Sequence, residues 1–343
     1  MSQLRSKMTC PDVALTELSK MLAGSAVLVT GGAGFIGSSL ARRLLELESD
    51  VYIADNLSRG CIENIESLDR IHLLRLDLTN MDNCMVAAKG MDYIFHLAAP
   101  VGGIHYIKKY NVENLTPGLL MNTNMLEAAR KNDIERYLFA SSACIYRERD
   151  GSLNEFKEED AYPANPATTY GWVKLLGEIQ CRSYYTDFGM KCCAPRIFNA
   201  YGENENLDPK WSHVIPSLIR KALLYPREGF KIFGDGRQER AFMYVQDCVE
   251  GLILAMQKIK DADPINLGSE ELIPIGDLAK EIARLSGKGM NLEYDSSGPQ
   301  GTHRYCACTR KMKRVLGWTP NVALRDGLAR TYEWARRRLN VEG

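Results

Sequence analysis

Three glycines near the start of the chain have a spacing that suits the binding of a dinucleotide. Gly31, Gly34 and Gly37 form a G-x-x-G-x-x-G pattern directly after an apolar stretch, residues 26–30, that predicts a buried strand. Glycines allow a tight turn and a close approach of the backbone to a pyrophosphate, and the helix that begins there offers amide donors and the positive end of its dipole. A second strand that ends in an acidic residue completes the pattern expected of a dinucleotide site.

Asp55 is that acidic residue, and it bears on which dinucleotide binds. Its carboxylate can accept hydrogen bonds from the hydroxyls of a ribose and would repel a 2′-phosphate, so the sequence favours NAD over NADP. Arg59 leaves NADP open, because a nearby arginine can accommodate that phosphate.

A serine, a tyrosine and a lysine further along the chain are residue types that transfer protons beside a nicotinamide. Tyr170 and Lys174 lie at positions i and i+4, on one face of a predicted helix. An ammonium beside a phenol is expected to lower the pKa of the phenol, so that Tyr170 can move a proton while hydride is transferred. Ser142 follows a predicted strand at its carboxyl end, where its hydroxyl can hydrogen-bond the oxygen being oxidised.

The elements that must position these residues alternate between strand and helix. Alternating strands and helices give parallel strands joined by crossover helices, and almost wholly apolar strands indicate a sheet covered on both faces. We therefore predict an α/β fold with a doubly wound parallel sheet. The predicted strands are 26–30, 51–55, 71–76, 93–97, 137–141 and 191–197, and the predicted helices are 35–47, 81–88, 119–131 and 168–185.

The last third of the chain has shorter and more mixed elements, which is typical of a smaller lobe over the sheet. Ligands of open α/β sheets bind outside the carboxyl ends of the strands, so we expect a cleft between sheet and lobe. The predicted parts are an N-terminal extension (1–23), an NAD-binding Rossmann domain (24–198) and a C-terminal substrate lobe (199–343) whose chain can cross back to the sheet. Its predicted helices are 217–224, 245–258, 275–286 and 324–338.

Taken together, these motifs resemble the extended short-chain dehydrogenase/reductases. The resemblance covers about residues 25–340 and includes HLAA at 96–99, RIFNAYG at 196–202 and GDG at 234–236. Members of that family modify nucleotide-diphosphate sugars with bound NAD(P), so the resemblance implies this substrate class and Ser142, Tyr170 and Lys174 as the redox triad. It also implies cofactor contacts from Phe35, Ile36, Asn56, Arg59, Asp77, Leu78, Leu97, Ala98 and Ala99.

A cysteine two positions after Ser142 indicates a particular branch of that family. The stretch SSACIY, residues 141–146, is very similar to that of the GDP-mannose 3,5-epimerases, and GDP-fucose synthases also carry a cysteine there. Sugar 4,6-dehydratases have an acidic pair after the hydroxyl residue, which Ala143 and Cys144 do not supply. Once C4 of a sugar is a ketone, its C3 and C5 protons become acidic, and inversion needs a base on one face and an acid on the other. A tuned thiol at Cys144 can serve as one of them, or Cys144 is only a small packing residue.

The second proton-transfer group is expected before a helix of the lobe. WSHVIP, residues 211–216, resembles the stretch of GDP-fucose synthases that carries a catalytic histidine, which makes His213 the first choice. Lys210 is the second, because GDP-mannose 3,5-epimerases use a lysine in this region with which Lys210 aligns only after a shift. Planar guanidinium groups suit pyrophosphate, and the predicted substrate contacts are Gly102, Gly103, Asn199, Val214, Arg240 and Arg304.

The resemblance leads to one preferred function and three alternatives. The preferred one is a GDP-sugar epimerase that acts at C3, C5 or both through a transient 4-keto sugar, with no net redox. The alternatives are a 4-epimerase of the UDP-glucose type, an epimerase/reductase of the GDP-fucose synthase kind, and a binding protein that kept the fold without turnover. The helices at 119–131 and 168–185 resemble those that pair in family dimers, which implies a homodimer.

Composition and charge exclude several other classes of function. Lys plus Arg and Asp plus Glu number 43 each in 343 residues, so there is no global basic field to hold nucleic acid or an anionic membrane. Ten cysteines without C-x-x-C spacing predict no metal site and a reducing compartment. No apolar run reaches the roughly 18 residues of a spanning helix, and charged residues interrupt any signal-peptide core at the N-terminus. We therefore expect a soluble cytoplasmic protein.

Overall fold

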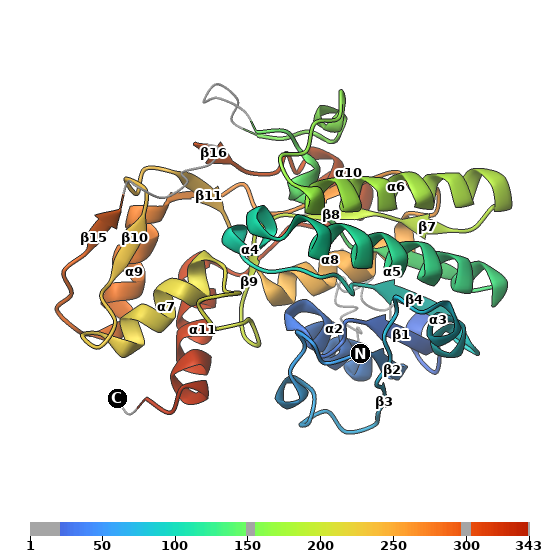
Figure 1. The fold of residues 1–343 in the computed structure, drawn as a ribbon, viewed down its shortest axis with the longest axis horizontal. Coiled ribbons are helices and arrows are strands. Elements are labelled where there is room, and N and C mark those ends of the chain that lie inside the picture. The colour runs from blue at the N-terminus through green and yellow to red at the C-terminus, as the bar shows by residue number, and fades with distance from the viewer. Residues whose placement is uncertain (1–20, 149–154, 296–302, 342–343) are drawn as a thin grey trace, which may run out of the picture.

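The computed structural model describes residues 21–148, 155–295 and 303–341 (Figure 1). At its centre lies a sheet of six parallel strands in the order β3-β2-β1-β4-β5-β7. The chain starts in the middle at β1, runs outward to β3, and returns to begin the other half at β4, which is the reversal of a doubly wound sheet. The predicted fold class is thereby confirmed. The strands are β1 (Ala26–Thr30), β2 (Asp50–Ala54), β3 (Ile71–Leu74), β4 (Tyr93–His96), β5 (Arg136–Phe139) and β7 (Cys192–Cys193).

Helices cover both faces of this sheet because successive apolar residues of each strand point to opposite sides. Leu28 packs with residues of α3, α5 and α6 on one face, whereas Val27 and Val29 pack with residues of α2 and α8 on the other. Figure 1 shows α5 and α6 lying side by side over the sheet. The helices are α2 (Phe35–Glu46), α3 (Met81–Ala88), α5 (Asn111–Lys131), α6 (Thr169–Phe188) and α8 (Val245–Lys258).

Several predicted elements differ from the structure. The predicted strand 137–141 divides between β5 and β6 (Ser141–Ser142), and two further differences lie near a proline. Helix α5 begins at Asn111, well before the predicted start, and contains Pro117, a residue type that usually ends or kinks a helix. The predicted strand 191–197 divides between β7 and a separate strand, β8 (Pro195–Ile197). Strand β8 lies between β6 (Ser141–Ser142) and β13 (Ile265–Leu267) in a second parallel sheet.

Residues after 199 contribute both to the lobe and to the main sheet. Helix α8 packs against α2 on the face of the sheet that Val27 and Val29 line, while α7, α9 and α11 share a separate apolar core. The division at residues 198 and 199 stays a prediction, and most of the predicted N-terminal extension lies outside the described residues. The elements of this part are β9 (Ala200–Tyr201), α7 (Val214–Leu224), β10 (Lys231–Phe233), β11 (Glu239–Ala241), β12 (Met243–Tyr244), β14 (Leu272–Pro274), α9 (Ile275–Ser286), β15 (Glu293–Asp295), β16 (Arg304–Tyr305), α10 (Arg310–Leu316) and α11 (Leu324–Arg338).

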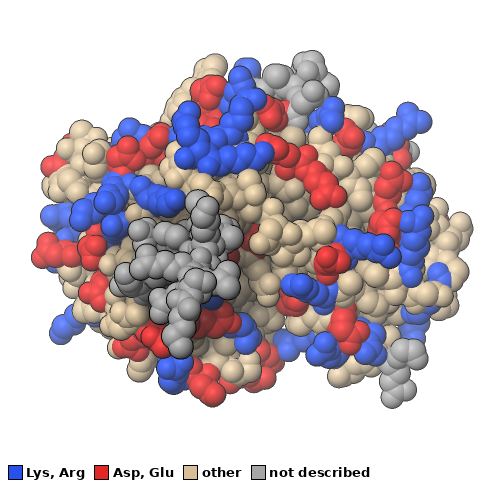
Figure 2. Space-filling model, turned by 180° about the vertical axis from the view of Figure 1, so that it is seen from behind, with Lys and Arg blue, Asp and Glu red and all other residues tan. Residues whose placement is uncertain are grey.

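Short elements complete the connections that matter for the site. They are the 3₁₀ turns η1 (Ile62–Asn64), η2 (Ala143–Ile145) and η3 (Glu158–Ala161), and the short helix α4 (Ile104–Lys109). Basic and acidic side chains are intermixed over the face drawn in Figure 2. Within the described ranges, none of the helices has the length and apolar character needed to cross a membrane.

Candidate active site

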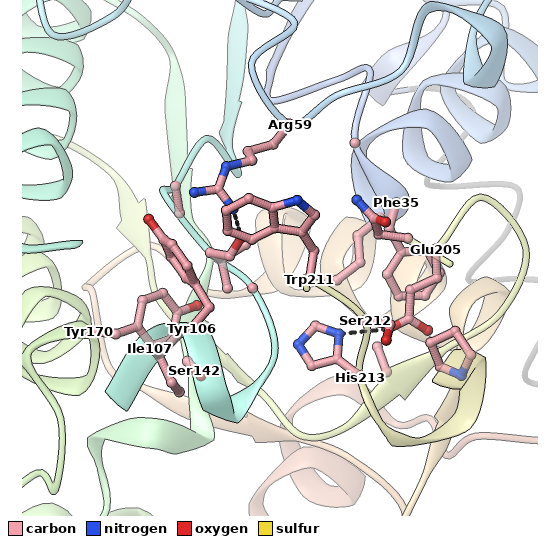
Figure 3. A pocket seen from close by; sticks show the side chains of 18 of the residues that line it. Phe35, Arg59, Tyr106, Ile107, Ser142, Tyr170, Glu205, Trp211, Ser212 and His213 are labelled. Atoms are coloured by element: carbon pink, nitrogen blue, oxygen red, sulfur yellow. Dashed lines mark hydrogen bonds and ion pairs between the residues drawn. The ribbon is translucent and has the colours of Figure 1, made fainter. Parts of the chain in front are cut away.

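A large cavity lies where the carboxyl edge of the main sheet meets the lobe, and Figure 3 shows part of it. Its volume of about 1620 Å³ exceeds the roughly 300–1,000 Å³ typical of a site for one small ligand. It therefore has room for a dinucleotide together with a second nucleotide-sized molecule. Two of its sides are named by their residues. The cofactor wall comprises Gly31 and residues 34–37 with the ends of β2 and β4, and the lobe wall comprises residues 204–209 and 211–216.

Most of the predicted site residues line this cavity, and three do not. Gly103, Lys210 and Arg304 are absent from its lining among the described residues. Those that line it are Gly31, Gly34, Phe35, Ile36, Gly37, Asp55, Asn56, Arg59, Asp77, Leu78, Leu97, Ala98, Ala99, Gly102, Ser142, Cys144, Tyr170, Lys174, Asn199, His213, Val214 and Arg240.

The glycine loop forms part of the cofactor wall because side chains there would have no room. A Cβ atom on Gly37 would lie 2.2 Å from the carbonyl oxygen of Gly31, and one on Gly31 would lie 2.9 Å from the backbone of Ala98. Gly31 also has a φ of +67°, which other residues rarely adopt. The loop thus presents bare backbone and the amino end of α2 to the cavity, an arrangement that fits the pyrophosphate of a dinucleotide.

Asp55 lies buried just after β2, where backbone amides hold its carboxylate. It accepts hydrogen bonds from the amides of Ala33 at 3.0 Å and Leu57 at 2.8 Å. Burial raises the pKa of Asp55, and the two amides oppose that shift. The carboxylate therefore stiffens the glycine loop and keeps lone pairs for ribose hydroxyls. Asp77 lines the same end of the cavity and accepts a hydrogen bond from the Thr79 hydroxyl at 2.8 Å.

Arg59 joins the two walls of the cavity. The carbon of its guanidinium lies 3.6 Å from the centroid of the Trp211 ring and 4.3 Å from that of the Tyr106 ring. One of its N–H groups donates to the carbonyl of Val101 at 3.3 Å. The loop after β2 is thus attached to the loop before α7, a contact that the sequence did not predict.

Ser142, Tyr170 and Lys174 come together because helix α6 begins directly against the turn η2. A Cβ atom on Gly171 would lie 2.2 Å from the carbonyl oxygen of Cys144, so a glycine is needed for this approach. Within the first turns of α6, the Lys174 nitrogen lies 5.7 Å from the centroid of the Tyr170 ring. The predicted redox triad is therefore assembled on one side of the cavity.

Burial governs the protonation of this triad. Burial raises the pKa of Tyr170, with Cys144 adding to the shift and the Ser142 hydroxyl opposing it. Burial lowers the pKa of Lys174 to about 8. The predicted lowering of the phenol's pKa by Lys174 is wrong for this structure, because the ammonium donates to the Ala140 carbonyl at 2.7 Å and loss of water dominates at Tyr170.

Cys144 is half-buried in η2, beside the triad. Its amide donates to the Ser142 hydroxyl oxygen at 3.2 Å, which keeps the turn compact. Burial raises the pKa of the Cys144 thiol, while Ser142 and Lys174 oppose the shift. The side chain is thus a thiol near neutral pH, and it lines the cavity beside Ser142.

His213 faces the cavity from the lobe wall, as the residue that precedes α7. Its Nδ1 lies 2.6 Å from Oε1 of Glu205. The sequence analysis missed Glu205, which lies in an irregular loop without a motif of its own. Lys210 is exposed, and its ammonium lies 4.4 Å from the centroid of the Trp211 ring. The geometry therefore favours His213 over Lys210 as the second proton-transfer group.

The predicted substrate residues of the lobe are divided between the cavity and its surroundings. Arg240 lines the cavity and donates to the Glu239 carbonyl at 2.8 Å, and burial lowers its pKa. Asn199 has a φ of +37° and donates to the Ala241 carbonyl at 2.9 Å. Arg304 instead forms an ion pair with the Glu239 carboxylate at 2.8 Å. Its place as a phosphate contact stays a prediction.

Gly103 lets the loop after β4 pack closely against the loop before α7. Its amide donates to the Trp211 carbonyl at 2.9 Å, and a Cβ atom at this position would lie 2.4 Å from the Ser212 carbonyl oxygen. Gly102 lines the cavity next to the Tyr106 and Trp211 rings. These glycines therefore bring the end of β4 against the lobe wall.

A buried ion pair between Arg196 and Glu178 holds the segment that carries Ser142 in place. Arg196 donates to both carboxylate oxygens of Glu178, at 3.0 and 2.8 Å. The Ser141 hydroxyl also donates to Glu178, and Arg196 donates to the Tyr146 hydroxyl at 2.9 Å. The pair thus ties α6 and β8 to the two ends of the turn that carries Ser142.

The part of the chain that the structure describes contains no cluster of three histidine, cysteine or acidic residues able to hold a metal ion. Among the side chains that line the cavity, those of Tyr170, Cys144 and His213 can donate or accept a proton.

Comparisons with known proteins agree with this geometry. The model of the NAD dependent epimerase/dehydratase family matches residues 27–268. The GDP-mannose 3,5-epimerase of Arabidopsis thaliana is 33% identical over 92% of this chain and 83% of its own. The UDP-glucose 4-epimerase of Thermotoga maritima, solved with UDP-glucose, superimposes with a TM-score of 0.84 at 26% identity over 92% of this chain and 99% of its own. The UDP-glucuronic acid 4-epimerase of Bacillus cereus, solved with UDP-glucuronic acid and NAD, gives 0.81 at 28% identity over 91% and 99%.

Proposed function

Because the chain belongs to the NAD dependent epimerase/dehydratase family, we propose that it is a GDP-sugar epimerase that inverts C3, C5 or both through a transient 4-keto sugar. Membership confirms the predicted enzyme class, with NAD as cofactor and a nucleotide sugar as substrate. The choice of a GDP sugar rests on the SSACIY segment and on the similarity to a GDP-mannose 3,5-epimerase.

The observation that carries this proposal is the pair of proton-transfer groups on different walls of one cavity. Cys144 adjoins Ser142 on the sheet side, and His213 faces the same cavity from the lobe wall. Figure 3 shows His213 across the cavity from Ser142 and Tyr170. Epimerisation at C4 needs only the redox triad, whereas inversion at C3 or C5 needs an acid and a base on opposite faces of the sugar.

The first step takes place at C4. In its phenolate form, which burial disfavours, Tyr170 accepts the proton of the C4 hydroxyl through Oη, and the Ser142 hydroxyl hydrogen-bonds the same oxygen. Lys174 holds the start of α6 against the Ala140 carbonyl and so keeps Tyr170 in place. The glycine loop and Asp55 would hold NAD, which would supply a reversible hydride acceptor for C4, so that the complete reaction involves no net oxidation.

The second step uses the acidity that the C4 ketone confers on its neighbours. One of the pair, Cys144 Sγ or His213 Nε2, removes the C3 or C5 proton to give an enolate, and the other delivers a proton to the opposite face. Tyr170 then returns its proton to the C4 oxygen as the ketone is reduced.

Solvent-deuterium exchange tests the proposal directly. The protein is incubated with GDP-mannose in D₂O, then with UDP-glucose, and each sugar is examined by NMR. Deuterium at C3 or C5 of the GDP sugar is the expected result. Deuterium-free products epimerised at C4 would refute the proposal.

Cys144→Ser sharpens this test. The variant is expected to keep C4 oxidation, seen as absorbance of reduced cofactor, and to lose deuterium incorporation. Cys84→Ser is a matched control, because the Cys84 thiol donates to the Leu78 carbonyl at 3.2 Å and does not line the cavity among the described residues. Unchanged exchange in Cys144→Ser would exclude the thiol.

Two other activities of the family are outcomes of the same experiment. The likeness to a UDP-glucose 4-epimerase favours simple C4 inversion, in which Cys144 is packing only. An epimerase/reductase would consume reduced cofactor in proportion to product, and the carboxylate of Asp55 disfavours NADPH for that purpose.

We also propose a homodimer formed by α5 and α6. Apolar side chains lie exposed along these neighbouring helices, with Val112 and Leu120 on α5 and Trp172, Leu176 and Ile179 on α6. The α6 residues recur at i, i+4 and i+7, which places them on one face. Light scattering is expected to give twice the 38.5 kDa chain mass for the protein and the single chain mass for Ile179→Arg.

The cysteines described are all free thiols, which suits the cytoplasm that we propose as the location of the protein.

A further inference from the structure

The carboxylate of Glu205 is committed to His213. Its Oε1 bonds to Nδ1 of the imidazole at 2.6 Å, and its side chain is only 3% exposed, while that of His213 is 51% exposed. Its second oxygen, Oε2, has no hydrogen-bond partner among the described residues. A buried carboxylate with a single partner acts mainly on that partner, although solvent at the half-exposed imidazole screens part of the interaction.

The loop that carries Glu205 is anchored to the other half of the molecule. The neighbouring residue, Asn204, donates from its side chain to the Ser38 hydroxyl on α2 at 3.1 Å. The side chain of Asn64 donates to the Asn204 carbonyl at 3.4 Å. Glu205 is thus fixed relative to the helix that begins at the glycine loop, and through it His213 is fixed too.

We propose that Glu205 is a positioning residue for acid–base catalysis by His213, which it holds with Nε2 toward the sugar and stabilises in the imidazolium form. This inference rests on the proposed epimerase function. In the neutral ring, Nδ1–H donates to Glu205 and leaves the Nε2 lone pair as the base. In the charged ring, Nε2–H is the acid. In Figure 3 the free edge of the imidazole turns away from Glu205, toward the side of Ser142 and Tyr170.

Other charged groups around the lobe wall are engaged elsewhere. Asp208 accepts from the Lys210 amide at 2.8 Å, and the Arg59 guanidinium lies on the Trp211 ring. On α7, Arg220 pairs with Glu228 and the Lys221 ammonium donates to the Lys231 carbonyl. On the sheet side of the cavity, the proposed partner of His213 is the Cys144 thiol, which is uncharged near neutral pH. Glu205 is therefore the carboxylate that sets the charge of His213.

The sign of the expected effect is set by this arrangement. Partial desolvation of the half-exposed imidazole disfavours its charged form, but the Glu205 carboxylate outweighs this effect and raises the pKa of His213 above its usual value. Glu205→Gln keeps an acceptor for Nδ1 and removes the charge, so the pKa of His213 should fall. Whether His213 acts as base or acid, the limb of the pH–rate profile that reports it moves to lower pH.

The experiment compares the whole enzyme with three variants. Glu205→Gln removes the charge, Glu205→Asp keeps it at a shorter reach, and Glu203→Gln removes a nearby carboxylate that accepts from the Tyr244 hydroxyl at 2.6 Å instead. Each is examined by the pH dependence of deuterium exchange into GDP-mannose and by an NMR titration of labelled histidines. The chain has five histidines, and loss of a signal in His213→Ala assigns the one required.

The expected result is agreement between the two measurements. In Glu205→Gln, the His213 titration and the matching limb of the exchange profile both move to lower pH by about one pH unit, with kcat falling more than KM rises. Glu205→Asp recovers part of the shift, and Glu203→Gln behaves as the parent enzyme.

Three results would overturn the proposal: an unchanged His213 titration, a titration that moves while the exchange profile does not, or an equal response to Glu203→Gln. Absence of exchange in the parent enzyme with both nucleotide sugars would instead refute the proposed function. The NMR titration alone then decides whether Glu205 controls the charge of His213.

Discussion

The two walls of the cavity are built in different ways. The cofactor wall is made of backbone: Gly31 and Gly37 leave no space for a side chain, and Asp55 is held by amides. The lobe wall is made of side chains that hold one another, as Glu205 holds His213. Backbone shape is set by a short run of residues, whereas side-chain pairs depend on segments that meet only in the folded chain.

Because of this difference, we expect substitutions in the two walls to affect NAD binding and proton transfer separately. A Cβ atom added to the cofactor wall must move backbone, so changes there should remove NAD and lower stability together. A side chain changed on the lobe wall or in the triad leaves the backbone in place, so binding should survive while proton transfer is lost. Variants of the two kinds can therefore test the comparison.

The largest effect is expected for Gly37→Ala. The new methyl group would lie 2.2 Å from the Gly31 carbonyl oxygen, so the loop must distort, at a cost of about 1–3 kcal/mol or more. Titration calorimetry should detect no NAD binding, and the melting temperature should fall. Gly229→Ala is the control, since a Cβ atom there meets nothing within 4 Å. Normal NAD affinity in Gly37→Ala would mean that the cofactor wall yields more than its packing indicates.

The next largest effect is expected for Tyr170→Phe. Removal of the hydroxyl takes away the proton acceptor at C4, and general acid–base groups contribute about 10²–10⁴-fold to rates. Turnover should fall by about a thousandfold within that range, while NAD binds with unchanged affinity. Tyr185→Phe, an exposed position on the same helix, should have no effect. A joint loss of NAD binding and turnover in Tyr170→Phe would erase the distinction between the walls.

The sequence predicts features that lie within short segments, and it does not predict contacts between distant loops. The glycine loop, Asp55 and the Tyr170–Lys174 pair lie in short segments whose periodicity and spacing carry the signal, and the structure places them together. The contacts of Arg59 with Trp211, and of Glu205 with His213, join loops that have no regular period, so no local pattern announces them.

Two errors have the same origin. The expected effect of Lys174 on Tyr170 failed because burial, which spacing does not reveal, dominates both pKa values. The strand predicted at 191–197 divides just before Pro195 into β7 and β8, which pair with strands of two different sheets, and its apolar pattern does not reveal those partners.

Loss of the buried ion pair between Arg196 and Glu178 should lower the free energy of unfolding. Arg196→Met leaves the Glu178 carboxylate buried without its bidentate partner, and breaking such a pair costs about 3–5 kcal/mol. Urea denaturation should show this loss, and Arg196→Met with Glu178→Met should recover most of it. Arg336→Met breaks a half-exposed surface pair with Glu333 and should cost only about 0–1 kcal/mol. A loss as small as that of the control would show that the buried pair stabilises the fold no more than a surface pair does.

The smallest effect is expected for Arg59→Ala, which tests a contact that joins the two walls through a cation and aromatic rings. The guanidinium lies 3.6 Å from the centroid of the Trp211 ring, and such contacts contribute about 0.5–1 kcal/mol at partly exposed sites. Since the contact bridges the cavity that holds the dinucleotide, its loss should speed NADH release by about two- to fivefold at that energy, measured by stopped-flow fluorescence. Arg59→Lys keeps the charge but not the planar stack and should fall between, and the exposed Arg75→Ala should release NADH normally. If NADH release is unchanged while kcat for the sugar falls, Arg59 contributes to the chemistry of the lobe wall and not to NAD binding. The part of the loop after β2 that serves NAD binding would then end at Asp55 and would not include Arg59.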